Sequence, residues 1–187
     1  MTAEEVADRL EIAEVLARYC HAVDNGDLEM ALGVYWPDAT DHHGDHWDGN
    51  GQDYMRNLIG RFAAACPPGS GRRACVHQLG AVLIAPGGPD EARVQCSFTA
   101  FVPHEEDGAE RLALLVGRFL DRFQRRDGEW RILERTVVND FSRADLGGPI
   151  YGPGSWQAGG YPAGGFGAAD PGVAFLAGAF AERAGTR

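Results

Sequence analysis

Apolar residues recur at helical spacing in the first part of the chain. Within residues 3–23, steps of three and four separate the apolar positions Val6, Leu10, Ala13, Leu16, Tyr19, Cys20 and Val23. This stripe predicts an amphipathic helix whose apolar side faces a core. Thr2 is suited to cap the first turn of this helix, and Asn25 with Gly26 is suited to end it.

Two shorter helices are predicted next. Asp27 is a suitable N-cap for a helix from residue 28 to about residue 35, and Pro37 would close that helix. Residues 39–43 predict a short strand, and residues 43–50 predict a polar turn. A third helix is predicted over residues 51–65, and the Pro-Pro-Gly run at 67–69 ends it.

The period of the apolar residues then changes from 3.6 to 2, which indicates strands. Strands are predicted at residues 74–84, 92–102, 112–125 and 130–141, and Asp127 with Gly128 is the strongest hairpin signal between them. Three helices followed by such a meander predict an α+β fold. We expect a cone-shaped roll, in which the helices pack on a curved, mostly antiparallel sheet that is open at one end.

The last part of the chain has a different composition. We assign residues 1–146 to the cone domain and residues 147–187 to a C-terminal tail that is rich in Gly, Pro and aromatic residues. Asp170 and Pro171 would start a short helix that ends near residue 182. The aromatic residues favour a tail that covers the cone or a neighbouring subunit, and a loosely ordered surface arm is the alternative.

Composition and charge narrow the classes of function. The length of 187 residues fits one domain, and the net charge of −10 argues against a nucleic-acid-binding surface. All 17 basic residues are Arg, so Schiff-base chemistry and the P-loop lysine are excluded. No apolar run approaches 18 residues, and the N-terminus lacks a signal-peptide pattern. We therefore expect a cytoplasmic protein without membrane contact.

His77 is the most informative single residue. It lies on a strand face that is otherwise apolar, which we expect to include Cys75, Leu79, Ala81 and Leu83. An imidazole there needs a polar partner, so it is either a core histidine bonded to backbone or Tyr, or the general base of a pocket. The four cysteines, Cys20, Cys66, Cys75 and Cys96, show no disulfide or zinc spacing and are expected to be small buried residues.

Three further positions suggest chemistry, and each has a structural alternative. Asp24 ends the first helix, where it is either a pocket carboxylate or a turn residue, and Tyr19 lies five residues earlier. Arg135 alternates with Leu133, Val137, Asn139 and Phe141. It would hold a substrate oxyanion inside the cone or form a structural ion pair.

The polar segment after the second helix resembles a metal cluster only superficially. Its Asp and His residues, at positions 41, 42, 43, 45 and 46, lack the spacing of a ligand set, so we predict no metal site. We expect one or two of its members, such as Asp41 or His42, to line a pocket instead.

Several segments together resemble one family. They are IAEVLARYCHAVDNGD at residues 12–27, then YWPDATDHHG, VHQLGAVLI, GRFLDRFQRRDGEWRI and RTVVNDFSR. In this order they are similar to SnoaL-like proteins of the nuclear transport factor 2-like superfamily, over about residues 8–143. That superfamily includes scytalone dehydratase, bile acid 7α-dehydratase, hexachlorocyclohexane dehydrochlorinase and polyketide cyclases, and also non-catalytic β subunits of dioxygenases.

The resemblance implies a small-molecule pocket and a set of site residues. Asp24 and His77 fall at the positions of an Asp–His pair in the lyase branch, where the Asp orients the His and the His takes a proton. Tyr19 and Arg135 fall at or near two further catalytic positions. The pocket would also include Trp36, which stands where many relatives have a smaller ring, together with Asp41, His42, Phe98 and Asn139.

We therefore expect a cofactor-independent lyase that acts on a mid-sized, apolar, ring-containing molecule by a dehydratase-like elimination. A polyketide-type cyclase or a ketosteroid-type isomerase would use the same base, and a non-catalytic ligand-binding or dioxygenase-β-like subunit is the alternative from another class. The resemblance also implies a homo-oligomer, a trimer before a dimer.

Overall fold

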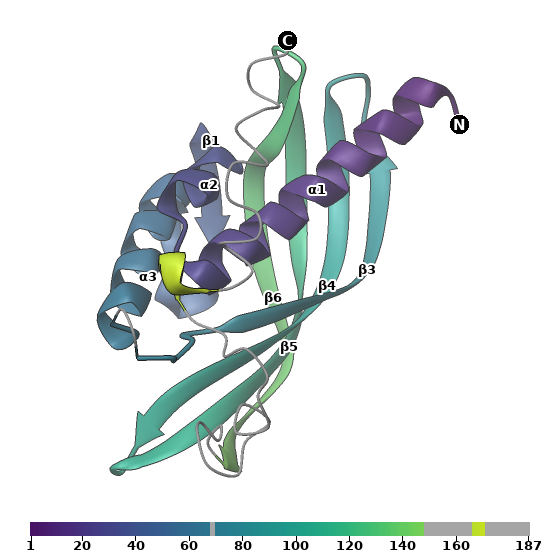
Figure 1. Ribbon diagram of the computed structural model, residues 1–187. Coiled ribbons are helices and arrows are strands. Elements are labelled where there is room, and N and C mark those ends of the chain that lie inside the picture. The colour runs from purple at the N-terminus through teal and green to yellow at the C-terminus, as the bar shows by residue number, and fades with distance from the viewer. Residues whose placement is uncertain (68–69, 148–165, 171–187) are drawn as a thin grey trace.

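The computed structural model describes residues 1–67, 70–147 and 166–170 of the chain. Helix α1 (Ala3–Asn25) crosses the inner face of a long curved sheet, and α2 (Leu28–Gly33) and α3 (Gly51–Ala65) cover one side of it (Figure 1). The predicted α+β cone is confirmed. Residues 148–165 and 171–187, which include the helix predicted after Asp170, lie outside the described residues.

The ends of α1 follow the predicted capping. Thr2 and Glu5 form a reciprocal capping box, with the Glu5 backbone N–H donating to Thr2 Oγ1 at 3.1 Å. Gly26 ends the helix in the left-handed region, at a φ of 72°, which a residue without Cβ adopts at little cost. Asp27 caps α2 by accepting from the Met30 backbone N–H at 2.9 Å.

The second helix is shorter than predicted, because the sheet takes over its last residues. It ends at Gly33, and β1 (Tyr35–His42) begins with a parallel pairing of Tyr35 and Ile132. Pro37, which was expected to close the helix, lies within β1. The β1–β6 register is interrupted between Tyr35 and Thr40, so the missing N–H of Pro37 costs no ladder hydrogen bond there.

The predicted polar turn contains short regular elements. A 3-10 turn, η1 (Gly44–His46), leads into β2 (Asp48–Asn50), which pairs antiparallel with β1. The long strands are β3 (Val76–Pro86), β4 (Glu91–Glu106), β5 (Ala109–Arg126) and β6 (Glu129–Gly147). The order in the six-stranded sheet is β2-β1-β6-β5-β4-β3, and only the β1–β6 pair is parallel.

Two register shifts reverse the side-chain faces that simple alternation predicts. One lies between Leu79 and Val82 of β3, so Leu83 is exposed and Ile84 packs against the core instead. The other lies opposite Val116 and Gly117 of β5, so Phe141 leaves the inner face and is 59% exposed. Both errors follow from the single extra residue that a bulge inserts, which sequence periodicity does not reveal.

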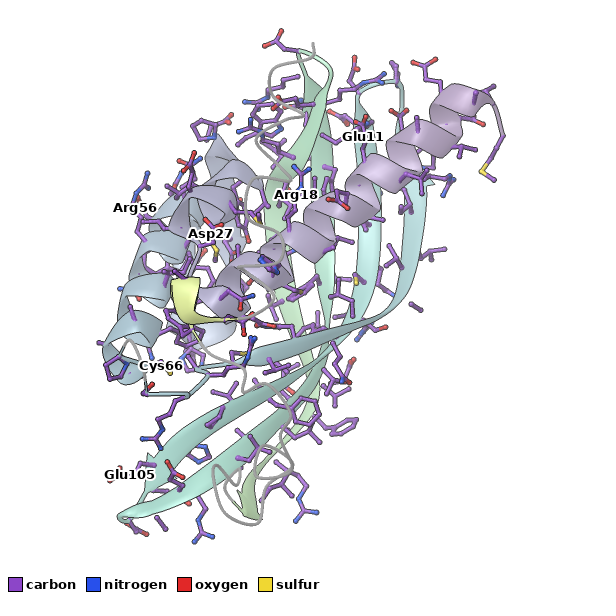
Figure 2. All side chains as sticks on the ribbon, viewed as in Figure 1. Glu11, Arg18, Asp27, Arg56, Cys66 and Glu105 are labelled. Atoms are coloured by element: carbon purple, nitrogen blue, oxygen red, sulfur yellow. The ribbon has the colours of Figure 1, made fainter. Side chains whose placement is uncertain are left out.

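The core lies between α1 and the inner face of the sheet. Helix α1 contributes Ile12, Leu16, Tyr19 and Val23, and the sheet contributes Cys96, Phe98, Phe119, Phe123 and Ile132. Charged side chains such as Arg56 on α3 and Glu105 on β4 point outward (Figure 2). Among the described residues, no helix combines the length and apolarity that a membrane crossing requires.

Gly117 marks the tightest packing of the sheet, and its substitution tests this arrangement. A Cβ at residue 117 would collide with the Val138 carbonyl and lie 2.9 Å from the Phe98 ring. We expect Gly117→Ala to lower the free energy of unfolding by about 1–3 kcal/mol through overpacking, measured by urea denaturation.

The matched control is Gly60→Ala on the exposed side of α3, where a Cβ meets no atom within 4 Å. This change should stabilise the protein by up to about 1 kcal/mol through helix propensity. Equal effects of the two substitutions would contradict the packing described for Gly117.

Candidate functional site

Asp24 and His77 meet where the last turn of α1 reaches the first residues of β3. Asp24 Oδ1 lies 2.6 Å from His77 Nδ1, and the His77 backbone N–H donates to Asp24 Oδ2 at 2.8 Å. Both side chains are 10% exposed. The carboxylate therefore holds the strand backbone and the imidazole together.

This geometry determines which ring nitrogen of His77 is available. With Nδ1–H donating to Asp24, the tautomer leaves the lone pair of Nε2 free to accept a proton. Among the described residues, the other polar atom within hydrogen-bond range of the ring nitrogens is Cys75 Sγ, which lies 3.6 Å from Nδ1 and 3.9 Å from Nε2. The pair has the arrangement that a general base requires.

Cys75 is a buried thiol beside this pair. Burial, followed by the charge of Asp24, raises the pKa of the Cys75 thiol well above its usual range, so the sulfur stays protonated and is a poor nucleophile. Donor atoms of Asp24, Cys75 and His77 all lie within 4.8 Å of one another. Among the described residues, these three could hold a soft divalent cation, although the sequence predicts no metal.

A short piece of the tail lies against this end of α1. Residues 166–170 include η3 (Gly167–Ala169), and Asp170 forms an ion pair with Arg73. The Phe166 ring occupies the space that a side chain at Gly26 would fill. Arg73 also donates to the Asp24 backbone carbonyl at 3.4 Å, so this tail segment lies close to the Asp24–His77 pair.

Aromatic rings from α1 and the sheet surround His77. Tyr19 lies 6.2 Å from the His77 ring and 5.4 Å from the Phe119 ring, measured between centroids. Phe98 lies 6.2 Å from His77 and stacks on Phe119 at 4.3 Å. We call Tyr19, Phe98 and Phe119 the aromatic wall. Burial, followed by Tyr54, raises the pKa of the Tyr19 hydroxyl well above its ordinary value, so Tyr19 is a neutral hydrogen-bond donor.

Arg135 forms a structural ion pair behind the aromatic wall. Its guanidinium donates to both carboxylate oxygens of Asp121, at 2.8 and 2.7 Å, and both side chains are fully buried. It stacks on Phe119 at 4.0 Å and on Tyr19 at 4.2 Å. Its Nη1 has no hydrogen-bond acceptor among the described residues. Burial alone would lower the pKa of the Arg135 guanidinium, but the negative charge of Asp121 and other neighbouring groups outweigh it. The pKa is therefore raised well above its ordinary value, and Arg135 stays charged.

A second Asp–His pair lies at the end of β1, where Asp41 belongs to the strand and His43 directly follows it. Asp41 is buried, accepts a hydrogen bond from the Tyr35 hydroxyl at 2.5 Å, and forms a short contact with His43 Nδ1. The His43 ring packs on Tyr54 of α3 with centroids 4.3 Å apart. The sequence pattern indicated Asp41 as a site residue but not His43, Tyr35 or Asp121. His43 lies just beyond the end of β1, so strand alternation alone does not indicate that it meets Asp41.

Three predicted pocket residues do not join this site. His42 points to the opposite face of β1 from Asp41, is about half exposed, and pairs with Asp48 at 3.6 Å. Trp36 lies opposite Tyr35 in the same alternation and packs beneath Arg126 and Arg131. Asn139 pairs with Gly117 on the inner face of the sheet, and its side chain is exposed. The structure therefore brings neither residue to the Asp24–His77 pair: His42 lies on the exposed face of β1, and Trp36 is buried with its Nε1–H donating to the Gln124 carbonyl at 2.9 Å.

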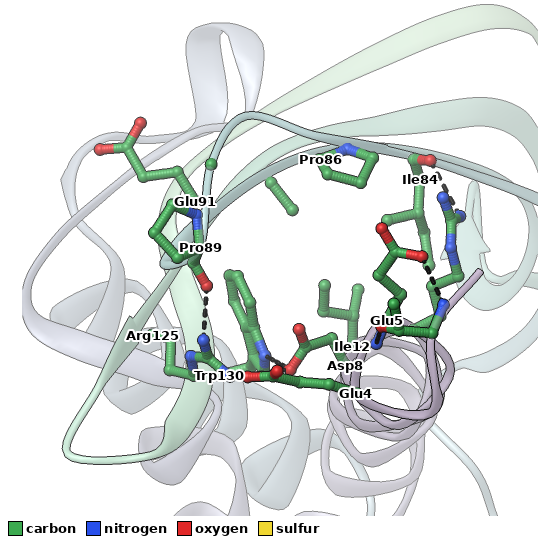
Figure 3. A pocket seen from close by; sticks show the side chains of 14 residues that line it. Glu4, Glu5, Asp8, Ile12, Ile84, Pro86, Pro89, Glu91, Arg125 and Trp130 are labelled. Carbon is green, nitrogen blue, oxygen red and sulfur yellow. Dashed lines mark hydrogen bonds and ion pairs between the residues drawn. The ribbon is translucent and has the colours of Figure 1, made fainter.

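A cleft of about 410 Å³ opens at the other end of α1, between its first turns and the β3–β4 and β5–β6 turns (Figure 3). Ile12 and Trp130 form its apolar base, and Glu4 and Glu91 lie at its rim. Asp8 accepts hydrogen bonds there from Trp130 at 2.8 Å and Arg125 at 3.0 Å. Sixteen residues of helix separate Asp8 from Asp24, or about 24 Å along the axis, so this cleft is distinct from the Asp24–His77 site.

Removal of one partner of the buried ion pair tests its structural role. Arg135→Met leaves the Asp121 carboxylate buried without its cation, so we expect a loss of about 3–5 kcal/mol in the free energy of unfolding. The double variant Arg135→Met, Asp121→Leu should lose less than the single one. Asp140→Asn, which breaks the exposed pair with Arg118, is the control and should change the urea midpoint least. A double variant less stable than Arg135→Met would contradict the structural role of the pair.

Comparison with known proteins places the fold in a family. The sequence model of the SnoaL-like domain matches residues 4–136. No protein with curated functional information matches this sequence. A hexachlorocyclohexane dehydrochlorinase LinA-type3 from Novosphingobium barchaimii has a similar structure, with a TM-score of 0.67 and 14% identity over 80% of this chain and 98% of that one.

Two further solved structures are similar. A putative scytalone dehydratase from Novosphingobium aromaticivorans has a TM-score of 0.63 and 19% identity over 81% of this chain and all of that one. A protein of unknown function from Mycobacterium tuberculosis has a TM-score of 0.58 and 25% identity over 73% of this chain and 74% of that one. Together with the match over residues 4–136, these similarities show that the chain belongs to the SnoaL-like domain family and has the nuclear transport factor 2-like fold.

Proposed function

We propose that this protein is a cofactor-independent lyase in which the Asp24–His77 pair acts as the general base. The 2.6 Å contact between Asp24 Oδ1 and His77 Nδ1 is the observation that carries the proposal. Membership of the SnoaL-like domain family and the similarity to dehydratase and dehydrochlorinase structures support an elimination or a related reaction.

The proposed reaction begins with proton abstraction. His77 Nε2 takes a proton from a carbon next to an activating group, and the Asp24 carboxylate stabilises the imidazolium that forms. The C–H electron pair becomes the new double bond, and the bond to the leaving group breaks on the adjacent carbon. A positioned general base contributes typically about 10²–10⁴-fold to such a step, and the largely apolar surroundings strengthen the charge interactions.

The other predicted residues fit supporting roles. Phe98, which stacks on Phe119, lies 6.2 Å from the His77 ring and makes the surroundings of the imidazole apolar, which suits a ring-containing substrate. The neutral hydroxyl of Tyr19 is suited to donate a hydrogen bond to developing negative charge. Arg135, held by Asp121 and stacked on the Tyr19 ring, is a positioning residue for Tyr19 in this proposal.

Asp24→Asn tests the proposed base directly. Asparagine keeps an oxygen that can accept the His77 backbone N–H, but it removes the negative charge that orients and stabilises the imidazolium. We expect turnover to fall by at least about 10²-fold with little change in unfolding midpoint, measured by the loss of water or hydrogen halide from ring substrates, scytalone and hexachlorocyclohexane among them.

Asp27→Asn in the same turn is the matched control. Asparagine caps helices as well as aspartate does, so the α2 cap to Met30 remains and turnover should be unchanged. Full activity in Asp24→Asn would refute the proposed base. A product with the mass of the substrate would move the assignment to an isomerase or a cyclase, and turnover-free binding that persists in His77→Ala would move it to a binding protein.

We also propose a homo-oligomer, with a trimer as the first expectation and a dimer as the second. Light scattering of the purified protein should give two or three times the mass of the 20.1 kDa chain. A monomeric mass at working concentration would refute this proposal.

A further inference from the structure

The Asp41–His43 pair repeats the arrangement of the Asp24–His77 pair on a different part of the fold. In both pairs a carboxylate that is almost completely buried meets the Nδ1 atom of an imidazole. Asp41 has a second donor, the Tyr35 hydroxyl at 2.5 Å, so its orientation is fixed from two sides. An imidazole held this way at Nδ1 presents Nε2 as its reactive atom.

His43 is not sealed in the core. Its side chain is 15% exposed, and its ring rests on Tyr54 at a centroid distance of 4.3 Å. Within the described part of the chain, Nε2 of His43 has no hydrogen-bond partner. A histidine with only a packing role does not need a buried carboxylate at one ring nitrogen while the other nitrogen stays unpaired. This arrangement is typical of a functional imidazole.

The Tyr19 ring is a neighbour of both pairs. It is 6.2 Å from the His77 ring and 6.3 Å from the Tyr35 ring, whose hydroxyl reaches Asp41. On the α3 side, the Tyr54 ring packs on His43.

We propose that His43, held by Asp41, is the general acid that protonates the leaving group, opposite the base His77; this inference rests on the proposed lyase function. His77 Nε2 takes the carbon-bound proton, the double bond forms, and the C–O bond breaks. The departing oxygen takes the proton of His43 Nε2–H and leaves as water. The site then holds a protonated His77 and a neutral His43, and proton exchange with solvent restores it.

The neighbouring groups are less suited to this role. The guanidinium of Arg135 is fully buried and bound to both oxygens of Asp121, and it does not release its proton. Burial raises the pKa of the Tyr19 and Tyr54 hydroxyls, so both are weak acids near neutral pH. Imidazole is the side chain that ordinarily carries and releases a proton in this range.

The chemistry predicts a dependence on the leaving group. Hydroxide is a poor leaving group and needs a proton, whereas chloride leaves without one. The test compares 3-hydroxycyclohexanone with 3-chlorocyclohexanone, because both yield cyclohex-2-enone, which is followed by its ultraviolet absorbance. In His43→Gln we expect turnover of the hydroxy ketone to fall by about 10²-fold or more, and turnover of the chloro ketone to change by less than about 3-fold.

The adjacent residue provides a matched control. His42→Gln alters an exposed imidazole on the outer face of β1 and should leave both reactions unchanged. Equal losses on the two ketones in His43→Gln, or no loss on either, would overturn the assignment. The base is tested separately with His77→Gln. If that variant keeps its activity, the proposed lyase mechanism fails whatever His43 does. If His77→Gln loses activity but His43→Gln affects the two ketones alike, His43 is not the general acid, and the proposed base His77 still stands.

A second measurement does not require turnover. The ring C–H resonances of the six histidines can be followed by NMR while 2-naphthol, a flat ring with an acidic hydroxyl, is added. We expect the signals of His77 and His43 to shift together, while those of exposed His46 stay in place, and we expect Asp41→Asn to reduce the shift of the His43 signal. A His43 signal that 2-naphthol does not move, or that moves equally in Asp41→Asn, would overturn the proposal.

Discussion

A buried carboxylate at the end of α1 is the constraint on which the site depends. The C-terminal end of a helix carries partial negative charge, so Asp24 lies where its own charge is least favoured. Two donors from His77 compensate, one from the backbone and one from the ring. The same two contacts join α1 to β3, so the element that orients the imidazole also sets the position of the strand that carries it.

The interior beyond this pair combines charged groups with aromatic surfaces. Asp121, Arg135 and Asp41 are almost completely buried, and each has a defined partner. The Arg135 guanidinium packs over the rings of Tyr19, Phe119 and Tyr35. Low dielectric surroundings strengthen every interaction among them, which favours a rigid arrangement of donors and acceptors over one that rearranges with each bound molecule.

Sequence periodicity predicted the elements well and the exact faces less well. The capping residues Thr2, Asp27 and Gly26 act locally, so their roles could be inferred from neighbours in the chain. The bulges in β3 and β6 are set by pairing between strands, which reversed the expected faces of Leu83 and Phe141. The Asp24–His77 pair was anticipated through family resemblance, because its members are 53 residues apart and nothing in the local sequence links them. The positions of Trp36 and His42 were not foreseen because β1 begins earlier than predicted: it places His42 on the exposed face, and Trp36 is buried beneath Arg126 and Arg131.

The pairing of β1 with β6 has a consequence for the order in which the chain assembles. Asp121 and Arg135 are directly opposite each other in the β5–β6 hairpin, only 14 residues apart, so their charges neutralise one another within a local contact. Asp41 reaches the same region only when β1 docks in parallel on β6, across roughly 90 residues of chain. Contacts of such long separation form at a higher entropic cost, so we expect the β5–β6 hairpin to form a neutral surface before β1 docks on it.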